Sequence, residues 1–142
     1  MRLFPEAISA VLMPNHVHLI VADHRTHAQN LDRLYGWLGS VSRRKRTHQL
    51  WQSVPDPREI NDRGYLLRTI RYVALNPCRK RLCRDPAEWY WSTYRETLGA
   101  SVGRQNVATQ LARALAERSQ GFSKRLYQYI SADATVQSVG AG

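Results

Sequence analysis

Two apolar runs near the start of the chain predict a β-hairpin. The runs Ala7 to Met13 and His16 to Ala22 are rich in Val, Ile and Leu, and the turn signal Pro14-Asn15 separates them. The first run is almost wholly apolar, so we expect this strand to be buried on both faces. Residues i and i+2 of a strand point to the same face, so His16 and His18 are predicted to lie side by side.

The spacing of apolar residues after the hairpin is helical. A stripe at i, i+3, i+4, i+7 and i+10 predicts a helix from about His27 to Thr47; its members are Leu31, Leu34, Tyr35, Leu38 and Val41. A second stripe predicts a helix from Arg63 to Leu75, capped by Asp62 and stopped by Asn76-Pro77. The segment between these helices, Trp51 to Asn61, contains two prolines and is predicted to be a loop.

The remainder of the chain predicts an aromatic loop and further helices. Trp89, Tyr90, Trp91 and Tyr94 form an aromatic cluster after Asp85-Pro86. A helical pattern follows from about Gln105 to Ser119, and Phe122 to Ile130 either extends it or starts a short final helix. The last residues are small and polar. We therefore expect residues 1–99 to form the main domain and residues 100–142 a C-terminal helical extension and tail.

The charge of the chain indicates a polyanionic partner. Lys and Arg number 21 against 11 Asp and Glu, for a net charge of +10. Between Asp23 and Arg84 there are 14 basic and 5 acidic residues, so nearly all of the excess lies in the middle of the chain. A membrane surface is the competing partner, but it favours a basic amphipathic helix. The strongest basic run, Arg43 to Arg46, instead ends a predicted helix, so no membrane partner is expected.

The location follows from what the sequence contains. No secretory signal and no run of about 20 apolar residues is present. The two cysteines, Cys78 and Cys83, have neither a metal-site spacing nor the number of a disulfide framework. A cytoplasmic protein with reduced thiols is the expected case.

The histidine pair is half of a possible divalent-metal site. Two neutral imidazoles on a strand could supply two ligands, although a histidine beside a turn is more often a surface side chain. Asn76 is a candidate third ligand, and its amide oxygen would suit Mg²⁺ or Mn²⁺. In isolation, a helix-capping role for Asn76 before Pro77 is the favoured alternative.

Tyr72 is the candidate nucleophile. It lies four residues before Asn76 and therefore on the same helix face. A metal ion and the nearby Arg68 and Arg71 would favour its phenolate and neutralise charge on a reacting phosphate. The competing interpretation is a core tyrosine with a tethered hydroxyl group. The aromatic cluster likewise allows two interpretations, stacking on nucleic-acid bases or packing in the core.

These residues carry a resemblance to a known family. The stretch Val11-Leu12-Met13-Pro14-Asn15-His16-Val17-His18-Leu19-Ile20-Val21 resembles the His-hydrophobe-His motif of single-tyrosine HUH transposases, and most closely that of the REP-associated tyrosine transposases. Tyr65-Leu66-Leu67 with Arg71-Tyr72-Val73-Ala74-Leu75-Asn76-Pro77-Cys78-Arg79 is similar to the second block of that family. Trp91-Ser92-Thr93-Tyr94-Arg95, followed by Leu98-Gly99, resembles the third. The blocks occur in the family's order and cover about residues 7 to 99.

The resemblance implies a fold and an activity. The fold would be a ferredoxin-like α+β core, an antiparallel sheet with helices packed on one face. Mg²⁺ or Mn²⁺ would be held by His16, His18 and Asn76, and Tyr72 would attack a DNA phosphate to form a 5′-phosphotyrosine without a nucleotide cofactor. The DNA would be single-stranded or hairpin DNA of palindromic repeats. The basic residues that we expect to bind it are Arg43, Arg44, Lys45, Arg46, Arg68, Arg71, Arg79, Lys80 and Arg81.

Two departures from the family pattern lead to further expectations. The family has a strand and a helix before the histidine block, and here only about six residues precede it. A truncated fold is expected, with Val17 and Leu19 or the hairpin edge left exposed. A strand between Leu50 and Gly64 is also expected to be short or absent. The alternatives to an active transposase are a catalytically inactive DNA-binding remnant and, more weakly, a zinc-dependent phosphoesterase.

Overall fold

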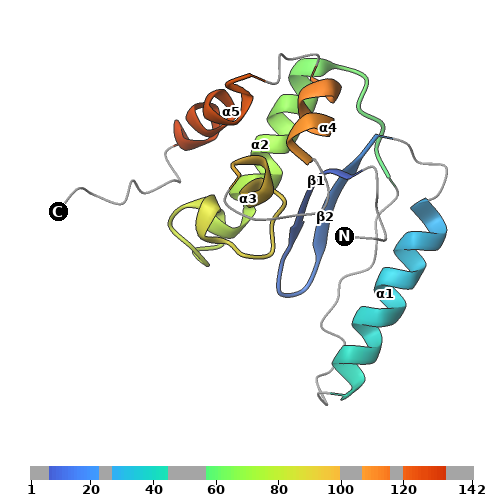
Figure 1. Ribbon diagram of the computed structural model, residues 1–142. Coiled ribbons are helices and arrows are strands. Elements are labelled where there is room, and N and C mark those ends of the chain that lie inside the picture. Colours follow the sequence, from blue (N-terminus) through green and yellow to red (C-terminus); the bar gives the residue numbers. More distant parts are fainter. Residues whose placement is uncertain (1–6, 23–26, 45–56, 100–106, 116–119, 134–142) are drawn as a thin grey trace.

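The computed structural model describes residues 7–22, 27–44, 57–99, 107–115 and 120–133 (Figure 1). Its elements are β1 (Ala7–Leu12), β2 (Val17–Val21), α1 (His27–Arg44), α2 (Arg63–Arg79), the 3-10 helix η1 (Pro86–Glu88), α3 (Tyr94–Thr97), α4 (Val107–Ala114) and α5 (Phe122–Ser131). The predicted α+β class is confirmed. Within the described ranges the sheet has two antiparallel strands, and no helix is long and apolar enough to cross a membrane.

The predicted hairpin is confirmed. Val11 of β1 lies opposite His18 of β2, and Leu12 lies opposite Val17. The Met13 amide donates to the His16 carbonyl at 2.9 Å and closes the turn. As expected, β1 is almost entirely buried. In this register His18 is flanked by paired residues on both sides, so pairing with β1 holds its backbone.

The second edge of β1 is also covered, by the segment that precedes α3. The Leu12 amide donates to the Trp91 carbonyl at 2.9 Å, and the Thr93 amide donates to the Ala10 carbonyl at 3.0 Å. The Thr93 hydroxyl adds a contact by accepting from the Ala10 amide at 2.8 Å. The segment from Trp91 to Thr93 therefore pairs with β1, the strand that also pairs with the histidine-bearing β2.

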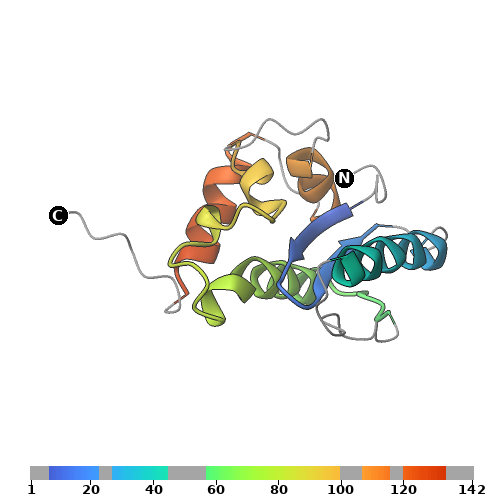
Figure 2. The same cartoon turned by 90° about the horizontal axis from the view of Figure 1, so that it is seen from below.

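Helices lie against both faces of the hairpin, so the expectation of helices on one face is wrong (Figures 1 and 2). On one face, Val17, Leu19 and Val21 of β2 pack with Leu34 and Leu38 of α1. The other face joins α2, α4 and α5 in the main core, which includes Val11, Ile20, Ile70, Leu75, Leu111 and Ile130.

Of the two expected alternatives, the exposure of Val17 and Leu19 is wrong, whereas within the described residues the outer edge of β2 has no strand partner. Both side chains are only partly exposed, because α1 covers the β2 face that points away from the histidines. The apolar stripe predicted for this helix makes the contact with β2, because its members Leu34 and Leu38 are buried there. Val41 of the same stripe lies at a position whose side chain is outside the described residues.

Helix α2 runs to Arg79, past the predicted stop at Asn76-Pro77. Pro77 lies in the last turn, where it lacks the N–H that would bond to the Val73 carbonyl. Its ring is fully buried, and this apolar burial offsets the lost hydrogen bond. The helix ends in a Schellman motif: the Leu82 amide donates to the Pro77 carbonyl at 2.9 Å, and the Arg81 amide donates to the Cys78 carbonyl at 2.8 Å. Asn76 is thus an internal helix residue, and the prediction that the helix stops at Asn76-Pro77 is corrected.

The other predictions along the chain have separate outcomes. Residues 57–62 have no regular secondary structure, as expected for the loop, and residues 51–56 lie outside the described residues. Helix α4 lies within the predicted segment, of which residues 105–106 and 116–119 lie outside the described residues, and α5 begins at Phe122. Tyr94 is buried in the main core.

Candidate functional site

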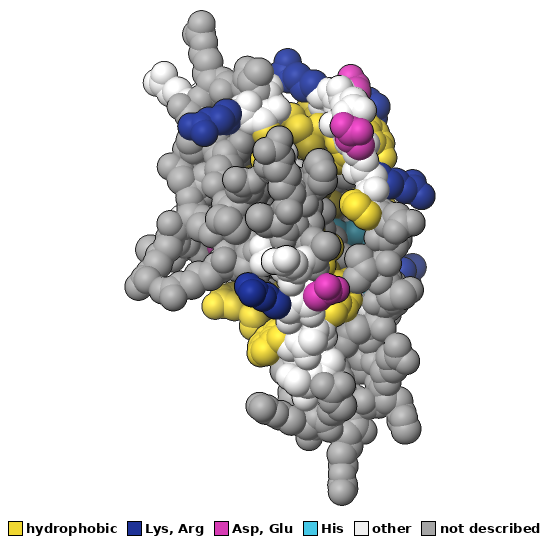
Figure 3. All heavy atoms as spheres, turned by 90° about the vertical axis from the view of Figure 1, so that its right-hand side faces the viewer, with side chains coloured by type: hydrophobic (Ala, Val, Ile, Leu, Met, Phe, Trp, Pro, Cys, Tyr) yellow, Lys and Arg dark blue, Asp and Glu magenta, His cyan; other side chains and the backbone are white. Residues whose placement is uncertain are grey.

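His16, His18 and Asn76 meet between the hairpin and α2. The Nε2 atoms of the two histidines are 3.1 Å apart, and the side chain of Asn76 forms a hydrogen bond with His18. The strand geometry explains the pair, because His16 and His18 are two residues apart and face α2. Histidine atoms reach the molecular surface on the face drawn in Figure 3, which also carries Lys and Arg side chains.

The orientation of the Asn76 amide follows from its second hydrogen bond. Its Nδ2 donates to the Tyr72 carbonyl at 3.0 Å. The amide oxygen is thereby left to accept from His18, which agrees with the direction of the effect of Asn76 on the His18 pKa. Asn76 is 4% exposed, so both bonds lie in a protected environment.

Tyr72 lies beside this group. Its ring centroid is 5.5 Å from that of His18, with the rings nearly perpendicular at 85°. The side chain is 47% exposed, so the alternative of a core tyrosine is wrong. One helical turn separates Tyr72 from Asn76, which explains how α2 presents both to the hairpin.

Asn15 orients the first histidine, a role that the sequence did not reveal. Nδ1 of His16 lies 2.7 Å from the Oδ1 atom of Asn15. An amide oxygen only accepts, so Nδ1 carries the proton and Nε2 keeps its lone pair. The position of Asn15 directly before the histidine was the available signal, but turn chemistry alone also explains an asparagine there.

Both histidines have a pKa below the usual 6.5. Partial burial is the largest cause for His16, followed by the charge of Lys80. For His18, partial burial is again the largest cause, the neighbouring His16 adds to it, and the bond to Asn76 opposes it. The neutral imidazole, the form that binds metals, is therefore favoured at both positions.

The donor atoms fit a divalent ion that takes nitrogen and oxygen ligands. Two nitrogens each about 2.1 Å from one ion at roughly 90° are about 3 Å apart, close to the observed 3.1 Å. The amide oxygen that faces His18 is a hard third donor. The described residues contain no group of three or more His, Cys, Asp or Glu side chains that could hold a metal, so the site depends on Asn76.

Two arginines of α2 pair with one carboxylate close to Tyr72. The guanidinium nitrogens of Arg71 and Arg79 lie 3.5 Å and 3.7 Å from Oδ2 of Asp133. Arg79 also lies over the Tyr72 ring, 5.2 Å from its centroid. Sequence reasoning missed Asp133, because only the return of α5 to α2 brings it near these arginines.

The other predicted DNA-binding residues divide into three groups. Lys80 and Arg81 are exposed at the end of α2, and the charge of Lys80 reaches His16. Arg68 is exposed one turn before Tyr72, with a long 3.9 Å contact to Asp62. Arg43 and Arg44 end α1 with side chains that are not described, and Lys45 and Arg46 lie outside the described residues.

Arg81 has a left-handed backbone, with φ of 58°. Glycine is the usual residue at this position of a Schellman motif, and a larger residue is strained there. We expect Arg81→Gly to raise the free energy of unfolding by about 0.5–1 kcal/mol.

Chemical denaturation of the variant and wild type measures the effect of Arg81→Gly. Lys80→Gly is the matched control, because φ of Lys80 is −89°. Glycine relieves no strain at a negative φ, and it loses more conformational entropy on folding than lysine does. We therefore expect Lys80→Gly to lower the free energy of unfolding. Equal stability changes in the two variants would contradict the assignment of strain to Arg81.

The lowered histidine pKa values predict a pH-dependent stability. Below the unfolded pKa of 6.5, the unfolded chain binds protons that the folded chain does not. With a chelator present, we expect the free energy of unfolding to fall as the pH drops through 6.5 toward the folded pKa values. Denaturation curves between about pH 7.5 and 5.5 should show a shallower fall for His18→Gln. Identical slopes for variant and wild type would disprove this contribution.

The aromatic cluster separates into two structural and two exposed residues. Tyr94 is buried, and burial raises its pKa above the usual range. Trp89 packs against the core and donates from Nε1 to the Leu12 carbonyl at 3.0 Å. Tyr90 and Trp91 are 72% and 60% exposed. The core interpretation is therefore correct for Tyr94 and wrong for Trp91.

Comparisons with protein-family models, curated proteins and solved structures found no match to this chain.

Proposed function

We propose that the protein cleaves and joins single-stranded or hairpin DNA, as a REP-associated tyrosine transposase with a ferredoxin-like core. The observation that carries the proposal is the position of Tyr72, whose ring contacts His18 next to His16 and Asn76. A nucleophile beside two neutral imidazoles and an amide oxygen is the arrangement that metal-assisted attack on a phosphate requires.

The proposed reaction exchanges one phosphoester for another. The Tyr72 oxygen forms a bond to phosphorus, the phenol proton is released, and the bond from phosphorus to the 3′ oxygen breaks. The leaving oxygen takes up a proton as a 3′-hydroxyl, and the 5′ end stays on Tyr72. Arg79 lies over the Tyr72 ring, and Arg71 precedes Tyr72 in the sequence; both would exchange their contacts with Asp133 for the phosphate.

A bound Mg²⁺ or Mn²⁺ would polarise the phosphate and offset its charge. His16, His18 and Asn76 would hold the ion, and Asn15 would keep His16 in the correct tautomer. These residues therefore act on the ion, and Tyr72 acts on the DNA.

The test of the proposal is a covalent protein–DNA adduct. The protein is incubated with hairpin-containing single-stranded DNA and Mn²⁺, with the label on either side of the cleavage position. We expect a denaturant-resistant adduct that carries the fragment 3′ of the break, attached through its 5′ phosphate. The adduct should need the metal and map by mass spectrometry to the peptide with Tyr72. An adduct on another residue, or none, would disprove the catalytic proposal.

The second candidate is a catalytically inactive DNA-binding remnant. Exposed Lys and Arg side chains favour it, because they can bind DNA phosphates whether or not a metal ion is held. Arg68, Lys80 and Arg81 are exposed along or just after α2. This candidate predicts salt-dependent binding to hairpin DNA that a chelator does not change. The absence of binding even at low salt would eliminate it.

A further inference from the structure

The two cysteines of the chain lie in contact at the end of α2. The Sγ atoms of Cys78 and Cys83 are 3.5 Å apart, so one thiol donates a hydrogen bond to the other. Both cysteines are free thiols; Cys78 is buried and Cys83 is half-buried. Positions five apart do not face each other on a straight helix. The contact therefore comes from the turn that follows α2.

The turn between the cysteines is closed by its own backbone. The Arg81 amide donates to the Cys78 carbonyl at 2.8 Å, and the Leu82 amide donates to the Pro77 carbonyl at 2.9 Å. These two bonds form the Schellman motif and return the chain, with Cys83, to the last turn of α2. The folded chain thus keeps this short loop closed without a covalent link.

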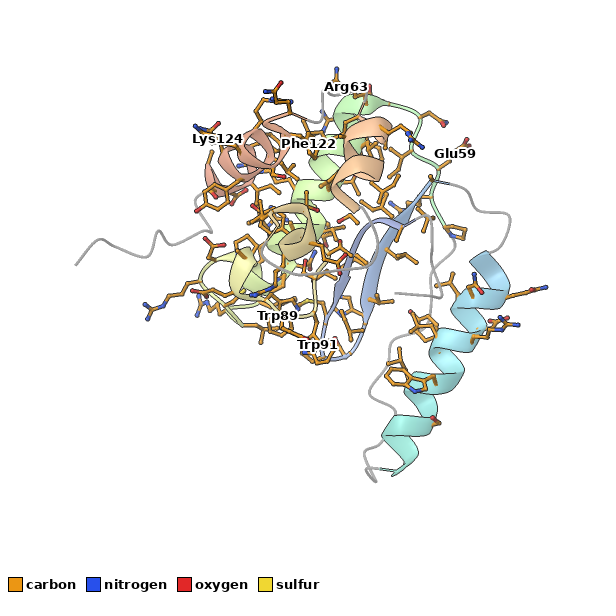
Figure 4. All side chains as sticks on the ribbon, in the orientation of Figure 1. Glu59, Arg63, Trp89, Trp91, Phe122 and Lys124 are labelled. Carbon is orange, nitrogen blue, oxygen red and sulfur yellow. The ribbon has the colours of Figure 1, made fainter. Side chains whose placement is uncertain are left out.

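The segment after the turn is fixed as well. Pro86 of η1 is fully buried. Trp89, labelled in Figure 4, packs against the core and donates from its indole N–H to the Leu12 carbonyl. Because the core holds both α2 and this segment, the contact between the two thiols is a property of the fold. A pair of thiols held in this way is suited to reversible oxidation.

We propose that Cys78 and Cys83 are a redox modification site, at which a small-molecule disulfide converts the two thiols to an intrachain disulfide that fixes the turn after α2. The Sγ atoms would come closer by about 1.5 Å, from 3.5 Å to the length of a disulfide bond. The same turn carries Lys80, whose charge reaches His16 of the candidate site. The inference does not depend on the proposed function.

The proposed oxidation is a thiol–disulfide exchange in two steps. Cys83 is the more exposed thiol, so its sulfur attacks the small disulfide, forms a mixed disulfide and releases one small thiol. The Cys78 sulfur then attacks the Cys83 sulfur and releases the second small thiol. The two protons of the protein thiols pass to the released thiols, and two electrons pass to the small disulfide. Burial raises the pKa of Cys83 to about 12, so the exchange is slow at neutral pH and is measured at equilibrium.

The test compares the folded and the unfolded full chain in buffers of reduced and oxidised glutathione. Samples reach equilibrium without denaturant or in concentrated urea, free thiols are alkylated after an acid quench, and mass spectrometry measures the fraction with an intrachain disulfide. We expect the equilibrium constant for disulfide formation to be at least about tenfold larger in the folded chain, because the fold already closes the loop. An equal or smaller constant in the folded chain would overturn the proposal.

Hydrogen exchange tests the effect of the disulfide on the turn. The Arg81 and Leu82 amides should exchange at least about fivefold more slowly in the oxidised chain, because the disulfide restrains opening of the turn. The Glu88 amide bonds to the Asp85 carbonyl beyond the turn and should be unaffected.

Cys83→Ser is the matched control, since it keeps Cys78 but cannot form the intrachain bond. The same oxidising treatment should leave its Arg81 and Leu82 amides unchanged. Unchanged exchange in the oxidised wild type, or equal slowing in Cys83→Ser, would contradict the role assigned to the disulfide. Neither experiment uses DNA or a metal ion, so a failed adduct test leaves these results unaffected.

Discussion

Tyr72→Phe is expected to form no covalent adduct with DNA while it binds the same DNA as tightly as wild type. The substitution removes only the hydroxyl oxygen. The ring contacts with His18 and Arg79, at centroid distances of 5.5 Å and 5.2 Å, do not need that atom. Loss of the nucleophile should reduce the rate of strand cleavage at least about a thousandfold.

Tyr65→Phe is the matched control for this experiment. Tyr65 is 42% exposed on α2, two turns before Tyr72, so it tests a second accessible tyrosine on the same helix. We expect this variant to form the adduct at the wild-type rate. Rates are measured by quenching timed reactions in denaturant and separating labelled protein from free DNA. Equal adduct formation by wild type and Tyr72→Phe would exclude Tyr72 as the nucleophile.

His18→Ala is expected to have the largest effect on metal binding. His18 is the residue that contacts both other donors, His16 at 3.1 Å and the Asn76 side chain. Removal of the His18 imidazole leaves only His16 and Asn76 as donors, without the side chain that both of them contact. Outer-sphere substitutions commonly cost 10- to 100-fold in metal affinity, so loss of this ligand should weaken Mn²⁺ binding by more than about 100-fold.

A graded series makes the assignment of His18 testable. Asn15→Ala keeps all three donors but removes the bond to His16 Nδ1, so it should weaken Mn²⁺ binding by about 10-fold or more, less than His18→Ala. Asn61→Ala changes an exposed asparagine before α2 and should leave binding unchanged. The paramagnetic resonance signal of free Mn²⁺ reports the binding. The same affinity in all three variants would place the ion elsewhere.

Local sequence patterns predicted the elements that build the site. Alternation within the hairpin predicted that His16 and His18 share a face, and the four-residue spacing predicted that Tyr72 and Asn76 share one. The stop signal at Asn76-Pro77 failed, because the buried Pro77 lies in the last helical turn and the side chain of Asn76 bonds back to Tyr72.

Other features had no local signal. Asp133 meets Arg71 and Arg79 only because α5 returns to α2. Tyr90 and Trp91 could not be told apart from their neighbours in a cluster of four aromatics within six positions. The path of the loop along β1 decided which rings are exposed and which are anchored.

The sequence by itself therefore determined the hairpin, the helical stripes, the shared face of the two histidines and the basic charge of the middle of the chain. These follow from backbone geometry and composition, which act between neighbouring residues. Only the tertiary structure decided that α2 covers the histidine face and α1 the opposite face. Both faces of β2 carry apolar side chains, so the choice depends on the burial of many residues that are distant in sequence. That choice brings Tyr72 and Asn76 to the histidine pair.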